Sequence, residues 1–419
     1  MRPSSFFLRN LRDALPTAAK EHLQSAIDAV VGARERGGRV VVVTGSGPNI
    51  HEGVTTLIAE LIRKGVVQGV ITSSAVVAHE MAGTLDRVKR IRVRDEKAFD
   101  EKALPIPGGI LPRGGVFEIN VLSPEERAEL EMECPAGWEL YEQLRGVPGD
   151  VVIKAAGNMA WPMGLRTERL ARVIRDLAAQ HGCTFEQFAG YGADPLTMIG
   201  AGARANAPVL VSIPQLVGGG AVGIAVGDSV PIARRAAAIA DLLAGADVII
   251  ESAIALSQEI HDGPFETYTG HGIWAAWDGV KTYSLKGKKL VRIDLDSNLE
   301  LAWRLEREGS EVQNAVDRGL PKAKRTGIPF RMEMSGFARL EGSVPVTADI
   351  GVAWPVLAHA LEERLELRLD FVSAPQESEE GRQMREWIAS EIGWIDRGLM
   401  LGKAGCGAPA ALPAATRAS

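Results

Sequence analysis

RVVVVTGSG, residues 39–47, is the stretch that decides the fold. It contains four consecutive valines, which form a short, β-branched and wholly apolar run, and glycines end it. A strand with one face in water would alternate polar and apolar residues. The run therefore predicts a central parallel strand that is buried on both faces.

The segments around this strand alternate between helix and strand. Residues 11–36 carry apolar side chains at helical spacing and end at Gly37-Gly38, so we expect one helix there. After the first strand, VTTLIAELIRKG (54–65) predicts a helix, VVQGVITSS (66–74) a strand and AVVAHEMAGTL (75–85) another helix.

The same alternation continues along most of the chain. We expect further strands at 151–158, 208–212, the end of 232–256, 288–296 and 343–354. Helices are expected at 163–182, at the start of 232–256, after 296 and after 354. This pattern predicts an α/β fold, a doubly wound and mostly parallel sheet with an inserted small subdomain.

The domain boundaries follow from composition. We expect an N-terminal helical segment at 1–38 and one α/β domain at 39–402. Residues of about 103–150 are rich in Gly and Pro and then acidic, which favours an insertion within that domain. The tail at 403–419 consists mostly of small residues and is expected to be disordered.

Composition excludes several classes of protein. The chain has 419 residues, 46% hydrophobic and 24% charged, which is ordinary globular usage. Its net charge is −6 and it has no basic stripe, so we expect no nucleic-acid partner. The sequence contains no run of 18 apolar residues, so we expect no membrane helix.

The expected compartment is the cytoplasm. The N-terminus lacks a long apolar segment of the kind found in secretory signals. The three cysteines, Cys134, Cys183 and Cys406, are sparse and odd in number, which favours a reducing environment.

In a parallel sheet, ligands bind beyond the carboxyl ends of the strands, so the residues after each strand matter most. The first such loop is TGSGPNIHEG (44–53). Its glycines let the backbone approach a ligand, and the following helix would offer free N–H groups to a phosphate. Pro48 and His51 interrupt the GxGxxG spacing, and a tight turn is the alternative interpretation.

The second loop is TSSAVVAHE (72–80). The hydroxyls of Thr72, Ser73 and Ser74 are suited to bind ribose or phosphate, although Ser73 or Ser74 could instead cap the next helix. His79 and Glu80 lie one turn into that helix, where a functional pair and a partly buried structural pair are both open interpretations.

The third loop, at 257–279, is the candidate catalytic segment. It combines Glu259, His261, Asp262 and His271 with several aromatic residues, which suits a pocket that orients a small organic substrate. The aromatic residues are equally explained by packing. No short HxH or HxxxH spacing occurs, so no metal site is predicted, and zinc binding by His261, Asp262 and His271 is the minor alternative.

The fourth loop is VTADIG (346–351), which contains Asp349 and Ile350. An acidic residue at a strand end is suited to bind ribose hydroxyls. The alternative role of Asp349 is to cap the following helix.

Together these pieces resemble two related families, the LOR/SDH-type domain that acts as an NAD-dependent ornithine cyclodeaminase, and deoxyhypusine synthase. The resemblance begins with Gly47-Pro48-x-x-His51-x-Gly53, then LIRKGVV (61–67), then Ala75-x-x-x-His79-Glu80. The LOR/SDH family commonly has Asp after this histidine, whereas this chain has Glu80. The resemblance continues at 208–212, 291–310 and 345–357.

The resemblance implies a deoxyhypusine synthase-like variant of the Rossmann fold with NAD as its cofactor. Asp349 corresponds to the aspartate that holds the NAD ribose in these families. The residues that the resemblance and the loops together assign to the cofactor are Gly47, Asn49, His51, Glu52, Gly53, Thr72, Ser73, Ser74, His79, Glu80, Asp349 and Ile350. It also implies a homo-oligomer, a tetramer in deoxyhypusine synthase.

The chain departs from both families at the chemistry. Deoxyhypusine synthase uses a lysine in the stretch that corresponds to SQEIHDG, and here no lysine occurs between Lys154 and Lys281. Covalent aminobutyl transfer is therefore not expected. In the same stretch the LOR/SDH pattern is not reproduced either.

The leading hypothesis is an NAD-dependent lyase, cyclodeaminase or transferase that acts on a small amine or amino-acid-like substrate. Hydride would pass to NAD and return, with no net redox change. His261 is the expected base, Glu259 or Asp262 would orient it or bind a substrate cation, and His271 is the reserve. The alternatives are a conventional NAD-dependent dehydrogenase and a non-catalytic nucleotide-binding protein.

Overall fold

A computed structural model describes residues 1–92, 116–135, 137–157, 159–253, 285, 287–295, 304, 314, 318 and 342–404 of the chain. Its centre is a six-stranded sheet in the order β6-β2-β1-β7-β8-β9, and every adjacent pair is parallel. The strands are β1 (Val40–Thr44), β2 (Gly69–Thr72), β6 (Val209–Val211), β7 (Val248–Ser252), β8 (Lys289–Asp294) and β9 (Ser343–Thr347).

The strand order confirms the predicted fold class. Numbered along the chain, the six strands lie in the order 3-2-1-4-5-6, which is the arrangement of the Rossmann fold. The order reverses between β1 and β7. In such sheets ligands bind in the crevice beyond the carboxyl ends of the strands at this reversal.

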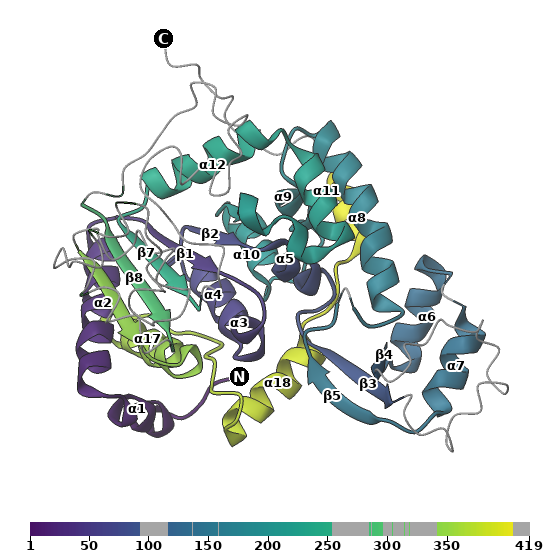
Figure 1. Ribbon diagram of the computed structural model, residues 1–419, viewed down its shortest axis with the longest axis horizontal. Helices are drawn as coiled ribbons and strands as arrows, with labels where there is room; N and C mark the ends of the chain where they lie inside the picture. The colour runs from purple at the N-terminus through teal and green to yellow at the C-terminus, as the bar shows by residue number, and fades with distance from the viewer. Residues whose placement is uncertain are drawn as a thin grey trace, which may run out of the picture.

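Helices lie on both faces of the sheet. The helices are α1 (Ser5–Ala14), α2 (Thr17–Glu35), α3 (Pro48–His51), α4 (Val54–Arg63), α5 (Ser74–Met81), α6 (Pro124–Glu133), α7 (Trp138–Gly146), α8 (Met163–Gln180), α9 (Phe185–Ala189), α10 (Met198–Ala205), α11 (Ala221–Ser229), α12 (Ile232–Ala244), α17 (Ile350–Arg364), α18 (Glu379–Glu391) and α19 (Arg397–Ala404). The helices α2, α4 and α17 cover one face and α12 covers the other (Figure 1). Alternate valines of β1 divide between the two cores that these helices form with the sheet.

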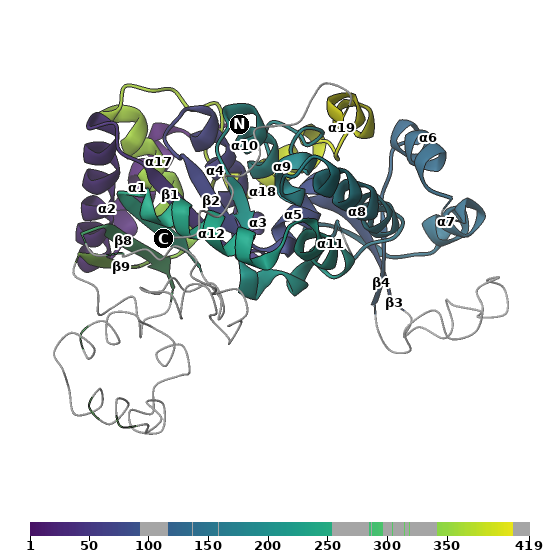
Figure 2. The ribbon, with the colours of Figure 1, turned by 90° about the horizontal axis from the view of Figure 1, so that it is seen from above.

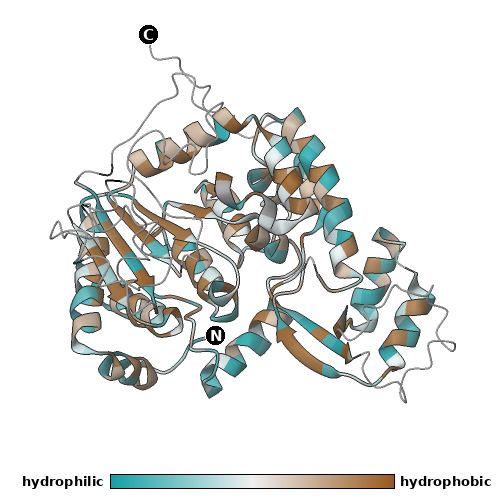
Figure 3. Cartoon of the chain, viewed as in Figure 1, coloured by the Kyte–Doolittle hydropathy of each residue, from teal (hydrophilic) through white to brown (hydrophobic). Residues whose placement is uncertain are grey.

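This division explains the sequence of β1. All five of its residues are buried, since Val40 and Val42 enter one core while Val41 and Val43 enter the other. Figure 3 colours the strands of the large sheet mainly as hydrophobic, whereas α18 at the periphery is largely hydrophilic. A strand buried on both faces needs a continuous apolar run, which is what the sequence has.

The predicted helix at 11–36 is two helices, α1 and α2. Leu15 is extended, with φ −65° and ψ 145°, and Pro16 begins the next helix. The ring of a proline disfavours helical geometry in the residue before it, so the apolar spacing continues through a break that periodicity does not detect.

A second, antiparallel sheet lies at the opposite end of the molecule from α1 and α2 (Figure 2). Its order is β4-β3-β5, with β3 (Asp86–Arg92), β4 (Val116–Asn120) and β5 (Asp150–Lys154). The strand expected at 151–158 therefore belongs to this sheet rather than to the large one. The small subdomain begins with β3 at Asp86, before the expected insertion at 103–150. Residues 93–115 lie outside the described part.

The last strand also differs from the expectation for 343–354. It ends at Thr347, because Asp349 caps α17 and the chain is helical from Ile350. Of the expected tail, residues 405–419 lie outside the described part. Cys134 and Cys183 are buried free thiols. Within the described residues, every helix is too short or too polar to span a membrane.

Candidate functional site at the strand ends

The first loop after β1 is tight and glycine-rich. Gly47 has φ +66°, a conformation that side chains rarely adopt, and no atom would meet a Cβ there. The helix that follows is a single turn, α3, with Pro48 in its first position. The sequence did not predict α3, and the helix expected after the loop is α4 (Val54–Arg63). The expectation that this longer helix presents N–H groups to a phosphate stays a prediction.

Three hydroxyl residues lie in a row across neighbouring strands. In the parallel register Ser252 of β7 pairs with Thr44 of β1, and the next pair after Val43 and Ile71 brings Thr44 beside Thr72 of β2. Neighbouring strands lie about 4.8 Å apart. The row therefore follows the carboxyl edge of the sheet on both sides of the strand-order reversal.

Two of these hydroxyls have no partner. Thr44 and Thr72 are both fully buried, and neither Oγ1 finds a hydrogen-bond partner in the described part of the chain. Buried polar groups in native proteins are almost always hydrogen-bonded. Other buried hydroxyls, such as that of Thr167 on α8, also lack partners, so it is their place at the edge where such folds bind ligands that makes Thr44 and Thr72 the candidate ligand groups.

Asn49 closes the loop against β7. Its Nδ2 donates to the Ser252 carbonyl at 3.1 Å, and the Ser252 hydroxyl donates to Asn49 Oδ1 at 2.6 Å. The buried Trp354 of α17 donates through Nε1 to the same hydroxyl at 2.7 Å. Asn49 therefore positions the first loop, and the sequence did not reveal its partners Ser252 and Trp354.

The two serines after Thr72 have different roles. Ser73 caps α5 by accepting from the N–H of Val76 at 3.3 Å, as one of the two interpretations expected. The carbonyls of Gln215 and Leu216 share the single hydroxyl proton of Ser74, and the same oxygen accepts from the N–H of Gly219 at 2.8 Å. The Ser74 hydroxyl thus binds the glycine loop that follows β6.

Glu52 links the first loop to the start of α17 and to the segment before α18. It is 4% exposed, and its Oε2 accepts from the N–H of Gln376 at 2.7 Å. A Cβ on Gly351 would lie 2.3 Å from this carboxylate, so the glycine permits the close approach. Burial raises the pKa of Glu52 to about 7, and the carboxylates of Asp349 and Glu377 act in the same direction.

Asp349 and Ile350 lie at the start of α17. Asp349 caps the helix by accepting from the N–H of Gly351 at 2.7 Å, and Ile350 is buried in the core. The close approach of Glu52 to Gly351, two positions after Asp349, places the start of α17 beside the end of α3. The structure therefore brings the first and last predicted loops together.

His79 and Glu80 are buried on α5 and face different partners. His79 Nδ1 accepts from the N–H of Gly157 at 3.2 Å, while Glu80 accepts from the N–H groups of Met198 and Ile199 at the start of α10. Burial lowers the pKa of His79 to about 4 and raises that of Glu80 to about 7. Glu80 is therefore a cap for α10.

Gly53 has a structural reason to be glycine. Its φ is +68°, and a Cβ there would lie 2.5 Å from Met384 Sδ of α18. The loop after α3 is thus in direct contact with α18.

The predicted catalytic residues Glu259, His261, Asp262 and His271 lie outside the described residues, so their roles stay predictions. Among the residues that the structure describes, no group of three His, Cys, Asp or Glu side chains could hold a metal ion.

An ion pair near the same edge was not anticipated. Arg292 of β8 donates to Glu251 of β7 at 2.7 Å, and both are buried. The two residues are paired in the sheet register. Only the register reveals the pair, because 41 positions separate the residues in the sequence.

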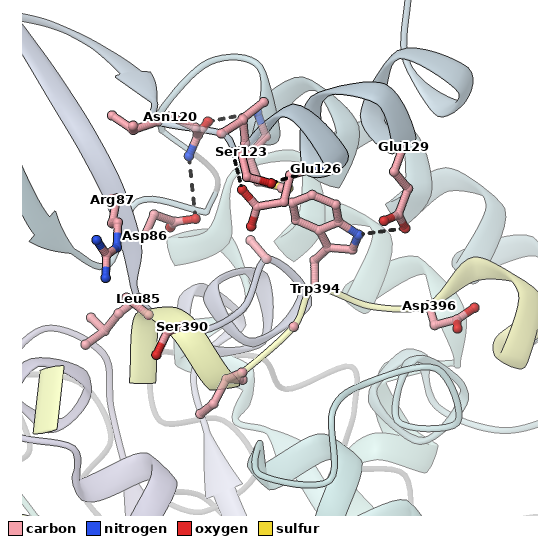
Figure 4. Close-up of a pocket in the computed structure, with 17 residues that line it drawn as sticks. Leu85, Asp86, Arg87, Asn120, Ser123, Glu126, Glu129, Ser390, Trp394 and Asp396 are labelled. Carbon is pink, nitrogen blue, oxygen red and sulfur yellow. Dashed lines mark hydrogen bonds between the residues drawn. The ribbon is translucent and has the colours of Figure 1, made fainter. Parts of the chain in front are cut away.

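A separate cavity of about 680 Å³ lies between β3, α6 and the segment after α18 (Figure 4). Asp86, Asn120, Glu126 and Trp394 line it, and none of the predicted site residues does. The cavity adjoins the carboxyl end of α5, whereas Thr72 precedes the amino end of this helix. The eight residues of α5 span about 12 Å, so this cavity is distinct from the strand-end site.

No protein-family model matches the chain, and no curated protein matches it. Among solved structures, the chain is similar to a mutant of AgrE in complex with L-arginine, with TM-score 0.38 and 15% identity over 88% of this chain and 35% of that one. It is similar to AgrE with ornithine and NAD+, with TM-score 0.37 and 16% identity over 83% and 34%.

A third similar structure is a conserved LOR/SDH protein from Methanococcus maripaludis S2, with TM-score 0.36 and 13% identity over 87% of this chain and 70% of that one. The chain spans about a third of the length of AgrE. TM-scores this low carry no argument about the fold. The fold assignment therefore rests on the strand order alone. None of these three is named as a deoxyhypusine synthase, so that resemblance stays a prediction.

Proposed function

We propose that the chain is an NAD-dependent enzyme that acts on a small amine or amino-acid-like substrate by transient hydride transfer, without net redox change. One observation carries the proposal. The unpartnered hydroxyls of Thr44 and Thr72 lie side by side at the carboxyl edge of a sheet with Rossmann strand order.

The residues present fit a dinucleotide. Thr44 and Thr72 would donate to its phosphate oxygens, or donate to or accept from its ribose hydroxyls, and the exposed Gly47 lets backbone approach it closely. Asn49, held by Ser252, keeps the loop in place. When bound, NAD would supply a reversible hydride acceptor.

The substrate-handling groups in this proposal come from the loop at 257–279. His261 would take the proton, with Glu259 or Asp262 beside it and His271 in reserve. The predicted reaction type, lyase, cyclodeaminase or transferase, depends on these residues. A conventional dehydrogenase differs in releasing NADH during turnover.

Native mass spectrometry of the purified chain tests the proposal. We expect NAD to bind at one equivalent per 44.8 kDa subunit, and the same spectrum reports whether the chain forms the expected homo-oligomer. Absence of any dinucleotide after incubation with NAD would reject the proposal. L-Arginine and ornithine, the compounds bound in the AgrE structures, are the first substrates to test.

A further inference from the structure

A group of nitrogen donors lies where the first loop meets the small sheet and α18. Met384 of α18 contacts Gly53, two positions after His51. The next residue, Arg385, donates to the Ile153 carbonyl of β5. In the segment that follows β5, the N–H of Gly157 donates to Nδ1 of His79. These contacts place His79 and Arg385 near the end of β5, and His51 lies between them, since it interacts electrostatically with both.

Arg385 is a half-buried guanidinium that pairs with no carboxylate among the described residues. Its one hydrogen bond is to the Ile153 carbonyl, and its buried Nε finds no partner in the described part of the chain. Removing a charge from water without a counter-ion is costly. A negatively charged partner from outside the chain would offset that cost.

His79 offers a second donor. The residue is 7% exposed, and its Nδ1 accepts from Gly157. A neutral imidazole that accepts at Nδ1 carries its proton on Nε2. This Nε2–H has no partner among the described residues, although the rest of the side chain is enclosed. His79 therefore presents one unused N–H from a buried, fixed ring.

The surrounding charge is positive. Burial lowers the pKa of His51, and the charges of Arg385 and Lys154 lower it further, so both cations act on His51. Lys154 shares the carboxylate of Glu118 with Arg90, at 2.9 Å and 3.1 Å. Both charges that act on His51 are therefore positive, and of the two Arg385 is the one without a carboxylate partner among the described residues.

We propose that Arg385, His79 and His51 form a binding site for a small oxyanion, a carboxylate or a phosphate group. Arg385 supplies the charge and His79 supplies a directed N–H, which are the donors that oxyanions take in proteins. The anion has two sources, the pyrophosphate of a dinucleotide or the carboxylate of a substrate. The site does not depend on the NAD proposal, since anions alone test it.

Isothermal titration of the full chain with pyrophosphate and, separately, with acetate tests the site at constant ionic strength. We expect at least one of them to bind, and Arg385→Gln to weaken that binding roughly tenfold or more, as loss of a charged hydrogen bond predicts. Arg382→Gln is the matched control, because Arg382 lies on the same helix with its side chain 70% exposed and should bind as the original chain does.

Arg385→Lys keeps the charge and should retain most of the affinity, which separates loss of charge from loss of fold. His79→Phe removes the N–H and should also weaken binding, with circular dichroism checking that it folds. Equal affinity in Arg385→Gln and the original chain, or no binding of either anion at millimolar concentration, would overturn the proposal.

The two sources are distinguished in the presence of NAD. If NAD competes with the anion, the site belongs to the dinucleotide pyrophosphate. If acetate still binds when NAD is saturating, the site takes a substrate carboxylate. A chain that binds the anion but not NAD would reject the proposed function and leave this site in place.

Discussion

Single residues at the strand ends divide into those whose polar atoms are used within the chain and those whose atoms are free. Asn49, Ser74, Glu80 and Asp349 all hold backbone or side-chain partners. Thr72 has none in the described part of the chain. The sequence showed all five as equally plausible ligand groups, because residue type does not reveal which hydrogen bonds the fold has already made.

Thr72→Val is predicted to weaken NAD binding three- to tenfold without lowering the stability of the free chain. The hydroxyl has no partner to lose on folding, whereas its loss leaves a ligand atom unsatisfied. Titration calorimetry and thermal melts measure the two effects. Thr167→Val on α8 is the matched control, since that hydroxyl is also buried and unpartnered but lies away from the strand ends. A stability loss with unchanged NAD affinity would contradict this interpretation.

Glu80→Gln is predicted to change how stability depends on pH. In the folded state the pKa of Glu80 is about 7, above its ordinary value of 4.5. Between these two values the folded state binds a proton that the unfolded state has lost. The stabilisation by this proton therefore disappears as the pH rises from about 5 to 8. Glutamine does not titrate. The stability advantage of the original chain over the variant should therefore shrink by about 2 kcal/mol between pH 5 and pH 8.

Urea denaturation at the two pH values measures this difference. The comparison with the variant cancels the opposite contribution of His79, whose lowered pKa destabilises the fold at acid pH in both chains. A constant difference between the two chains across this range would show that Glu80 keeps its ordinary pKa.

Among the secondary-structure elements, the β-strands of the large sheet were the most predictable. Their apolar runs are local signals, and each of the six stretches expected to form the large sheet contains an observed strand. The strand at 151–158 was placed in the wrong sheet because a strand's sequence does not name its partner. The one-turn α3 was missed, since a glycine loop and a short helix share the same residues.

Ser74→Ala is predicted to loosen the glycine loop after β6. The hydroxyl makes three hydrogen bonds to the backbone between Gln215 and Gly219, so we expect a loss of about 2 kcal/mol of stability and faster amide exchange at Gly219. Ser73→Ala removes one capping bond and should cost about 1 kcal/mol without affecting that amide. Similar exchange at Gly219 in both variants would refute the assignment.

For the molecule as a whole, the proposed function makes a prediction about the net consumption of NAD in the reaction. A chain that returns its hydride consumes no NAD, so we expect no NADH to accumulate during turnover of a substrate. NADH absorbance followed alongside substrate loss by chromatography measures this balance. One NADH released for each substrate consumed would instead establish the conventional dehydrogenase.

The sequence alone determined that the chain alternates β-strands and helices and that polar, glycine-rich loops follow the strands. These properties follow from side-chain periodicity over a few residues. The tertiary structure alone decided that β1 lies between β2 and β7, which places Thr44 beside Thr72 and Ser252 against Asn49. Strand pairing depends on packing between residues about 30 to 200 positions apart, and no local pattern encodes it.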